Sequence, residues 1–282
     1  MLQIDLHSHS LVSDGSLTPA ELVRHAAGQG IKVLALTDHD DTAGLAEARA
    51  TAAESGIAFI AGTEISVTWN RHTVHIVGLK IDPDNPALQA GLEAIRVGRV
   101  GRAAEIAAAL AKAGIQGSLE GAHAFASKRI IGRMHFAQFL AQQGYAKDVP
   151  SVFRKYLAKG KPGYVPHDWA ALEDAVRWIR EAGGLAVIAH PGRCDFGSTT
   201  LRALLGEFKE LGGTGIEVVT GSHTAEQAHL FAGHARRYGL LASVGSDYHG
   251  PGYKYLEMGR LPPLPDGCTP IWQDWPEAAA LV

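Results

Sequence analysis

The sequence is poor in cysteine and lacks a long hydrophobic run. Its 282 residues include two cysteines, Cys194 and Cys268, and neither has a second cysteine at metal-ligand spacing. This excludes a disulfide framework and a cluster of thiolate ligands. The first residues carry no charged leader or small-residue cleavage site, and no stretch approaches the roughly 20 apolar residues of a membrane span. We therefore predict a cytoplasmic protein without a membrane segment.

An excess of positive charge is also absent. The formal net charge is -3, so the chain lacks the broad positive field that drives non-specific binding to nucleic acid. An anionic substrate would have to be held locally, by metal ions or by a few arginines. Histidine, in contrast, is abundant, with 14 residues. It is the commonest metal ligand, and its side chain titrates near neutral pH.

Short apolar runs alternate with amphipathic segments, a pattern typical of parallel strands joined by helical crossovers. A first helix is predicted from Thr18 to Gly30, because Pro19 fits the first turn and Glu21 completes a capping box. Further helices are predicted over residues 42–55, 169–181, 200–211 and 224–238. Predicted strands end near Leu6, Thr37, Glu64, Leu79, His190, Val219 and Gly245. The fold class is therefore α/β, with a closed or nearly closed β/α barrel.

One segment interrupts this alternation. Residues 86–164 show little strand signal, whereas residues 102–113 and 133–143 have helical patterns. We predict a catalytic barrel formed by residues 1–85 and 165–282, with an inserted helical subdomain of residues 86–164 that caps the substrate. The segment after His249 is rich in proline and glycine and carries Trp272 and Trp275, so we expect a docked tail.

Polar side chains gather where the predicted strands end. In the first cluster His7 and His9 are two residues apart, so in an extended chain both face the same side. The clusters are Asp5-Leu6-His7-Ser8-His9, Thr37-Asp38-His39-Asp40, Gly62-Thr63-Glu64, His190-Pro191-Gly192-Arg193 and Ser246-Asp247-Tyr248-His249. In β/α barrels the catalytic groups lie at the carboxyl ends of the strands, because the βα loops converge there. We therefore expect these clusters to meet.

Nine side chains are competent metal ligands. They come from these clusters, from the loop after the first cluster, which carries Asp14, and from a return strand over residues 73–77, which carries His75. A single histidine after a strand is more often a satisfied core or surface residue. Metal binding explains all nine together, and oxygen and nitrogen ligands without thiolate suit manganese, zinc or iron. Nine ligands exceed the needs of one ion, so we predict two or three. The nine are His7, His9, Asp14, His39, Glu64, His75, His190, Asp247 and His249.

Taken in order, the five clusters resemble the motifs of the polymerase and histidinol phosphatase (PHP) family over nearly the whole chain. The resemblance implies a distorted seven-stranded, TIM-like (β/α)7 barrel with two or three divalent ions, commonly manganese, with zinc, iron or magnesium as alternatives. It further implies that His7, His9, Glu64 and Asp247 hold one ion. Glu64 would bridge to a second ion on His75 and His190, and Asp14, His39 and His249 would hold the third.

Three further segments are similar to one branch of that family, the nucleoside 3',5'-bisphosphate phosphatases, some of which also act as 5'-3' exoribonucleases. They are residues 71–79, residues 131–136 around Arg133, and residues 161–165, Lys-Pro-Gly-Tyr-Val. The resemblance implies removal of the 3'-phosphate from nucleotides such as pAp, giving AMP, by metal-activated hydroxide. The expected partner is a small nucleotide, with short RNA as a further possibility, and no obligatory protein partner is evident.

Roles for individual residues follow from this hypothesis. Glu64 and Asp247 would be indispensable, and Arg193 would neutralise charge on the phosphoryl oxygens. His223, beside Ser222, would hydrogen-bond the phosphate or protonate the leaving oxygen. Candidates for binding the second phosphate are Arg133 and Lys161, although either could equally be a solvated surface charge, and Tyr164 would stack on a base or only pack.

Other interpretations remain open. The chain could mainly trim short RNA that carries a 5'-monophosphate, or it could hydrolyse histidinol phosphate. It could also be a non-catalytic metal-binding scaffold or a nucleic-acid-binding accessory, although nine competent ligands argue against this. The remaining histidines are assigned structural or surface roles, with His135 of special interest because it is close to Arg133. No adjacent base is evident for Cys194, so we expect it to be incidental.

Overall fold

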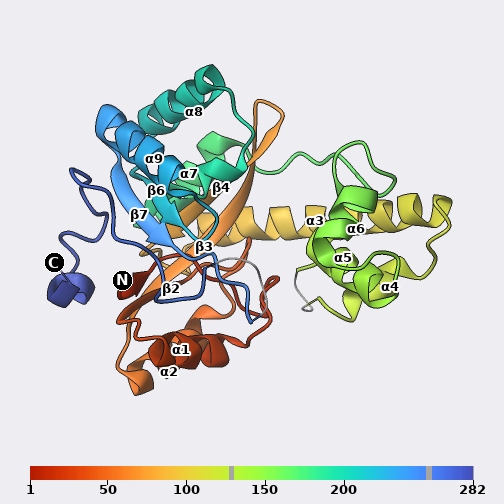
Figure 1. Cartoon of the computed structure of the whole chain (residues 1–282), viewed down its shortest axis with the longest axis horizontal. Coiled ribbons are helices and arrows are strands. Elements are labelled where there is room, and N and C mark those ends of the chain that lie inside the picture. Colours follow the sequence, from red (N-terminus) through yellow and green to blue (C-terminus); the bar gives the residue numbers. More distant parts are fainter. Residues whose placement is uncertain (127–129, 252–255, 282) are drawn as a thin grey trace.

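The computed structural model describes residues 1–126, 130–251 and 256–281. Within these residues the strands form a seven-stranded sheet in chain order, surrounded by helices (Figure 1). This confirms the predicted α/β barrel. The strands are β1 (Ile4–Asp5), β2 (Val33–Leu36), β3 (Ala58–Trp69), β4 (His72–Leu79), β5 (Leu185–Ile188), β6 (Gly215–Thr220) and β7 (Leu241–Gly245).

The barrel is distorted by one reversed strand. β4 runs antiparallel to both β3 and β5, whereas the other neighbouring pairs are parallel. The β3–β4 turn is tight because Asn70 and Arg71 both adopt positive φ, 46° and 62°, as two-residue hairpins require. β7 returns beside β1, where Leu6 N–H donates to the Val244 carbonyl over 3.1 Å. The sheet therefore closes on itself.

Helices cover the outside of the barrel. They are α1 (Pro19–Gly28), α2 (Leu45–Ser55), α7 (Leu172–Glu181), α8 (Ser198–Glu210) and α9 (Ala225–Tyr238). The predicted capping box of α1 is present, with the Thr18 side chain accepting the Glu21 N–H and Glu21 bonding back to Thr18. α2 begins three residues later than predicted, because the Asp41 carboxylate accepts the N–H groups of Thr42 and Ala43 and holds them in a turn.

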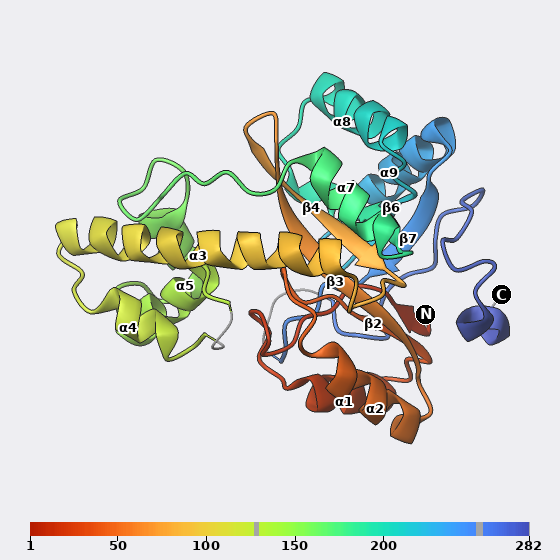
Figure 2. The ribbon, with the colours of Figure 1, turned by 180° about the vertical axis from the view of Figure 1, so that it is seen from behind.

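The inserted segment begins with a long helix that leaves the barrel (Figures 1 and 2). The inner turns of α3 (Pro86–Lys112) pack into the barrel core through Leu88 and Leu92, and its outer turns build a second core with Phe136 and Leu140. The predicted helix over residues 102–113 is thus the outer part of this longer helix. The other helices are α4 (Ser118–His123), α5 (Arg133–Gln142) and α6 (Val149–Val152), followed by a π-helical turn over Phe153–Leu157.

The described part of the carboxyl-terminal tail, residues 256–281, packs against the barrel. Ala242 of β7 donates its N–H to the Thr269 carbonyl over 2.8 Å, and Trp272 and Trp275 are both buried. A short 3-10 helix, η3 (Pro276–Leu281), ends this part. Among the described residues, no helix combines the length and apolar character needed to cross a membrane.

Candidate metal centre

The predicted ligands come from neighbouring strands and the loops after them. Both His7 and His9 lie just beyond β1, His39 follows β2, and His190 follows β5, while Asp247 and His249 come after β7. One expectation was wrong: β3 does not end at Glu64 but continues to Trp69, because its second half pairs with β4 in a hairpin. Glu64 is therefore a mid-strand residue, with His75 on the partner strand.

Glu64 lies at the centre of the site. Its side chain is fully buried, and each of its two carboxylate oxygens faces several imidazole nitrogens. One oxygen is 2.9 Å from His75 Nδ1 and 2.8 Å from His190 Nε2. The other is 2.9 Å from His39 Nδ1 and 3.3 Å from the Nε2 atoms of both His7 and His9.

In the part of the chain that the structure describes, three groups of side chains each place their ligand atoms within 4.8 Å of one another. Two of these groups match the sets of ligands that the family resemblance implied for the first and third ions. The difference is that His9 belongs to both groups. The third joins Glu64 and His75 to His39, with His190 bonded to the same Glu64 oxygen as His75. The groups are His7, His9, Glu64 and Asp247; His9, Asp14, His39 and His249; and His39, Glu64 and His75.

The donor set fits divalent ions. Within the described residues, buried carboxylate oxygens of Asp14, Glu64 and Asp247 have no hydrogen bond of acceptable geometry. The Nε2 atoms of His7 and His9 are only 3.1 Å apart. Crowding buried acceptors together is costly unless something positive satisfies them. Because all the groups offer carboxylate oxygen or imidazole nitrogen atoms, divalent ions suited to such ligands would satisfy them together.

Electrostatics in the site favour charged carboxylates and protonated inner histidines. Burial would raise the pKa of Glu64 and Asp247, but the surrounding histidines, and Arg193 in the case of Asp247, hold both pKa values well below the usual range. Burial disfavours protonated His9, yet the carboxylates of Asp247 and Glu64 that face its ring raise its pKa to about 10. His190 differs, because burial and the nearby Arg193 lower its pKa to about 4. Protons therefore compete with metal ions mainly at the inner histidines.

Glu217 was not identified from the sequence. It lies on β6, is buried, and its Oε1 atom is 2.7 Å from His7 Nδ1. Its other oxygen accepts the backbone N–H of His190. A carboxylate behind a ligating histidine fixes the tautomer, so that the opposite nitrogen, Nε2, faces the ion. The available signal was a lone glutamate inside the apolar run Ile216–Val219.

Asp38, the second residue of its cluster, supports the loop that carries Asp14. Its carboxylate accepts the hydroxyl groups of Ser10 and Ser13 over 2.6 Å each, and the Ser10 N–H over 2.8 Å. Because these bonds hold the loop between His9 and Asp14, Asp38 orients ligands without contributing to the three groups.

Of the predicted catalytic side chains, Arg193 meets the site and His223 does not. Arg193 forms an ion pair with Asp247 and donates from Nε to Ser222 Oγ over 3.2 Å. The Nε2 atom of His223 accepts the Gly192 N–H over 3.0 Å, and its Nδ1 is 3.0 Å from the Val218 carbonyl. Both ring nitrogens are thus engaged by backbone groups, which argues against His223 as a phosphate ligand or proton donor in this conformation.

The two residues predicted to bind the second phosphate, Arg133 and Lys161, differ in burial. Arg133, at the start of α5, is half-buried close to Arg99 and Arg102 of α3. Burial, together with the positive charges of Arg133 and Arg99, lowers the pKa of Arg102 to about 10. Lys161 is exposed. We call the narrow gap beside these arginines the arginine crevice; it has no room for a water molecule in this conformation and is lined by Arg99, Arg102, Ala103, Ile106, Ile131, Gly132 and Trp169. Tyr164 is half-buried and lies close to Arg102 and Arg133.

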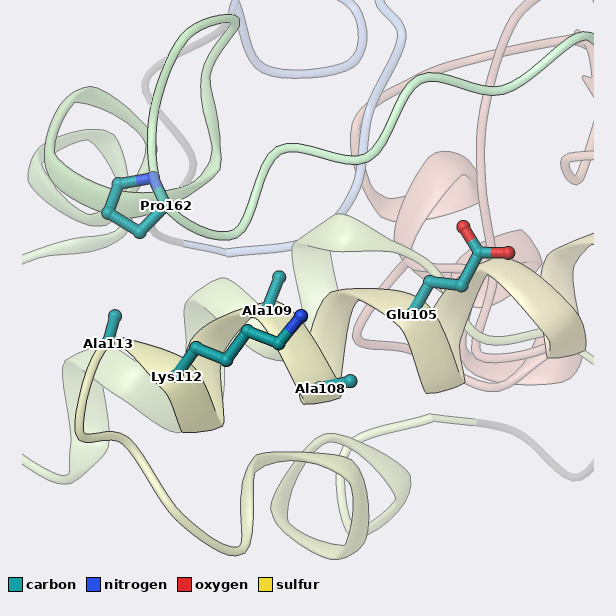
Figure 3. A pocket seen from close by; sticks show the side chains of 6 residues that line it. All are labelled: Glu105, Ala108, Ala109, Lys112, Ala113 and Pro162. Carbon is teal, nitrogen blue, oxygen red and sulfur yellow. The ribbon is translucent and has the colours of Figure 1, made fainter.

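A wider hollow lies on the outer turns of α3, facing Pro162 (Figure 3). Three alanines and Pro162 form its apolar wall, and Glu105 and Lys112 are its charged side chains. None of the proposed metal ligands lines it. Because ligand sites usually combine apolar walls with convergent polar groups, we assign it no role. Lys161 is the sequence neighbour of Pro162.

Comparisons with known proteins agree with this geometry. The chain is 55% identical over 275 residues to the 3',5'-nucleoside bisphosphate phosphatase of Chromobacterium violaceum, covering 97% of this chain and 96% of that protein. It is 44% identical over 273 residues to the 5'-3' exoribonuclease Rnm of Escherichia coli, covering 96% and 93%.

Solved structures give the same result. An amidohydrolase from Chromobacterium violaceum superposes with a TM-score of 0.93 at 55% identity, over 96% of this chain and 95% of that one. A putative metal-dependent phosphoesterase from Bifidobacterium adolescentis gives 0.81 at 28% identity, over 95% and 92%. A family model described as the PHP domain matches residues 5–220. The chain therefore belongs to the PHP domain family.

Proposed function

We propose that the chain is a phosphatase that removes the 3'-phosphate of nucleoside 3',5'-bisphosphates, for example converting pAp to AMP. The observation that carries this proposal is the proximity of two anion-binding features: a dense set of metal ligands and, beside it, the arginine crevice. A substrate with two phosphate groups can use both. The relative from Chromobacterium violaceum, whose name gives this activity, supports the proposal. Free Cys194 and Cys268 are consistent with the cytoplasmic location that we expect.

The reaction adds water across the bond between phosphorus and O3', giving a nucleoside 5'-monophosphate and inorganic phosphate. The nine ligands would hold two or three divalent ions, with manganese proposed first, and these would supply Lewis acids that polarise the phosphoryl oxygens and make water a better nucleophile. Glu64 belongs to two of the three groups and contacts His9 and His39 of the other. Arg193, at the edge of the site beside Asp247, would neutralise charge developing on the phosphoryl oxygens.

The 5'-phosphate would bind at the arginine crevice, which would have to widen to admit it because the gap is too narrow for a water molecule. Arg133 is the proposed bidentate ligand, because a guanidinium group binds phosphate through two nitrogens. Arg102 donates from two nitrogens to the Val165 carbonyl, so it would contribute its charge and its remaining nitrogen. The close approach of Arg99, Arg102 and Arg133, and the lowered pKa of Arg102, mark a place where positive charges are crowded and an anion is favoured. Arg99 also pairs with Asp40, so it would contribute mainly charge. Lys161 becomes a weaker candidate because it is exposed.

A second candidate function is 5'-3' trimming of short RNA with a 5'-monophosphate, which is favoured by the 44% identity to the exoribonuclease Rnm. The two reactions share their geometry. In both, a 5'-phosphate would be anchored while the bond between phosphorus and O3' of the same nucleoside breaks, so both release a nucleoside 5'-monophosphate. The reactions differ in whether the reacting phosphate carries another nucleotide.

A substrate panel tests the proposal. With Mn²⁺ supplied, we expect efficient product formation from pAp, weaker turnover of p-nitrophenyl phosphate and little from histidinol phosphate. Arg133→Ala should lower kcat/KM for pAp by at least tenfold, because a charged phosphate contact contributes on the order of 1.5–3 kcal/mol, and should change that for p-nitrophenyl phosphate little. Equal losses on both substrates would reject the assigned 5'-phosphate site. Preference for a 5'-phosphorylated oligoribonucleotide over pAp would favour the second candidate.

A further inference from the structure

The arginine crevice is joined to the metal centre through Asp40. Arg99 donates from Nε to Asp40 Oδ2 over 2.8 Å. Its Nη2 atom donates to the same oxygen and to Ser66 Oγ. Arg96, one helical turn earlier on α3, donates to the Asp40 carbonyl over 2.7 Å. Asp40 is fully buried, and its N–H donates to the carbonyl of Glu64 over 3.0 Å. This residue therefore ties α3 to the loop of His39.

A second connection runs from the inserted segment through His135. Its Nδ1 accepts the Gly132 N–H over 3.0 Å, which places the ring proton on Nε2, and Nε2 is 3.2 Å from the Ser13 carbonyl. The side chain is 2% exposed. Burial lowers the pKa of His135, which keeps this neutral tautomer. His135 thus links the first turn of α5, which carries Arg133, to the loop of Asp14.

The two connections end at the same group of metal ligands. Asp40 adjoins His39 and Ser13 adjoins Asp14, and both ligands belong to the group completed by His9 and His249. At the other end, Arg99 and Gly132 both line the arginine crevice. A small shift of α3 or α5 relative to the barrel would therefore change the crevice and this group of ligands together.

We propose that Asp40 and His135 are positioning residues that hold the arginine crevice in register with the Asp14–His39–His249 group, so that a phosphate in the crevice and a divalent ion at that group strengthen each other's binding. The inference rests on the proposed function. Each ligand restrains the same hydrogen-bonded frame, so the second to bind meets a site already ordered. Such coupling must be reciprocal between the two binding sites.

The test is Mn²⁺ binding by calorimetry to the full chain, with and without AMP, the expected product. In the wild-type protein AMP should raise the affinity of one class of Mn²⁺ sites by roughly 5-fold or more, within the usual range of coupling between sites. His135→Asn and Asp40→Asn should each remove most of this enhancement while retaining Mn²⁺ binding in the absence of AMP. His123→Asn, an exposed histidine of the same inserted segment, should behave as wild type.

Different results overturn different statements. If AMP binds to the wild-type protein but leaves Mn²⁺ affinity unchanged, or if both variants keep the full enhancement, the coupling is wrong and the proposed function stands. If AMP fails to bind, or if its binding is insensitive to Arg133→Ala, the assigned 5'-phosphate site fails, and the coupling fails with it. Thermal unfolding of each variant checks folding, and His135→Asn alone suffices should Asp40→Asn not fold.

Discussion

At the scale of single residues, the second layer of carboxylates decides which imidazole atoms face the ions. The Glu217 side chain bonds to the His7 ring through one carboxylate oxygen and accepts the backbone N–H of His190 with the other. These two histidines belong to different parts of the ligand set. His190 also has a strained backbone, with φ at 26°, a conformation that persists only when the surroundings hold it. One glutamate thus supports two ligands whose local chain would otherwise relax.

Glu217→Gln should weaken Mn²⁺ binding by about 10–100-fold, the usual effect of losing a partner behind a ligand. The amide keeps the size of the side chain and can still accept one hydrogen bond, but it removes the charge that orients the His7 ring. Calorimetric Mn²⁺ affinity measures the effect. Glu207→Gln, which alters a carboxylate that accepts the Trp69 indole N–H outside the site, is the matched control. Affinities within twofold of wild type for Glu217→Gln would contradict the assigned role.

At the scale of elements, the site depends on how closely β1 and β7 approach. His7 and His9 stand on the chain leaving β1, and Asp247 and His249 on the chain leaving β7. The Asp247 N–H donates to the His7 carbonyl over 2.8 Å, and the His9 N–H to the Tyr248 carbonyl over 2.9 Å. The pairing that closes the barrel between β1 and β7 therefore also brings His7 and His9 next to Asp247 and His249.

Gly245→Ala should damage stability and metal binding at once. A Cβ at this position would lie 2.2 Å from the His7 Cβ and 2.8 Å from the His7 backbone nitrogen, so relief requires β1 and β7 to separate. We expect a loss of about 1–3 kcal/mol or more in the free energy of unfolding, measured by urea denaturation, and a lower metal content. Gly233→Ala on α9, where a Cβ meets nothing within 4 Å, should instead stabilise the protein by up to about 1 kcal/mol. Equal changes in the free energy of unfolding for Gly245→Ala and Gly233→Ala would contradict the proposed clash at Gly245.

At the scale of the whole molecule, much of the fold and most of the candidate site could be predicted from the sequence. Strand ends are visible in sequence because apolar runs stop abruptly at polar clusters, and the candidate ligands lie there. The arginines of α3 could not be assigned, because Arg99 and Arg102 have the spacing of ordinary helical surface residues and become buried only when the inserted segment packs on the barrel. Lys161 was chosen for its charge and its place in a motif, neither of which predicts burial.

The same ligand set should give the metal-free and metal-loaded proteins opposite responses to pH. Without metal, His9 has its pKa raised from 6.5 to about 10, so its contribution to stability is complete below pH 6.5 and is lost as pH rises toward 10. The pKa values of Glu64, Asp14 and Asp247 are lowered, so their contribution is present above about pH 4.5 and is lost in acid. The metal-free protein should therefore be most stable between these limits.

Metal binding requires protons to leave His7 and His9, so it strengthens as pH rises. In thermal unfolding with EDTA, Tm should fall from pH 6.5 to pH 9, whereas the increase in Tm produced by Mn²⁺ should grow from pH 6 to pH 8. A Mn²⁺-dependent increase that stayed constant or shrank over this range would show that the inner histidines do not exchange protons for metal. The control is His234→Asn, which removes a histidine of α9 outside the three ligand groups. It should leave both pH trends in Tm unchanged, because the opposite trends arise only from histidines and carboxylates that are buried together in the proposed metal site.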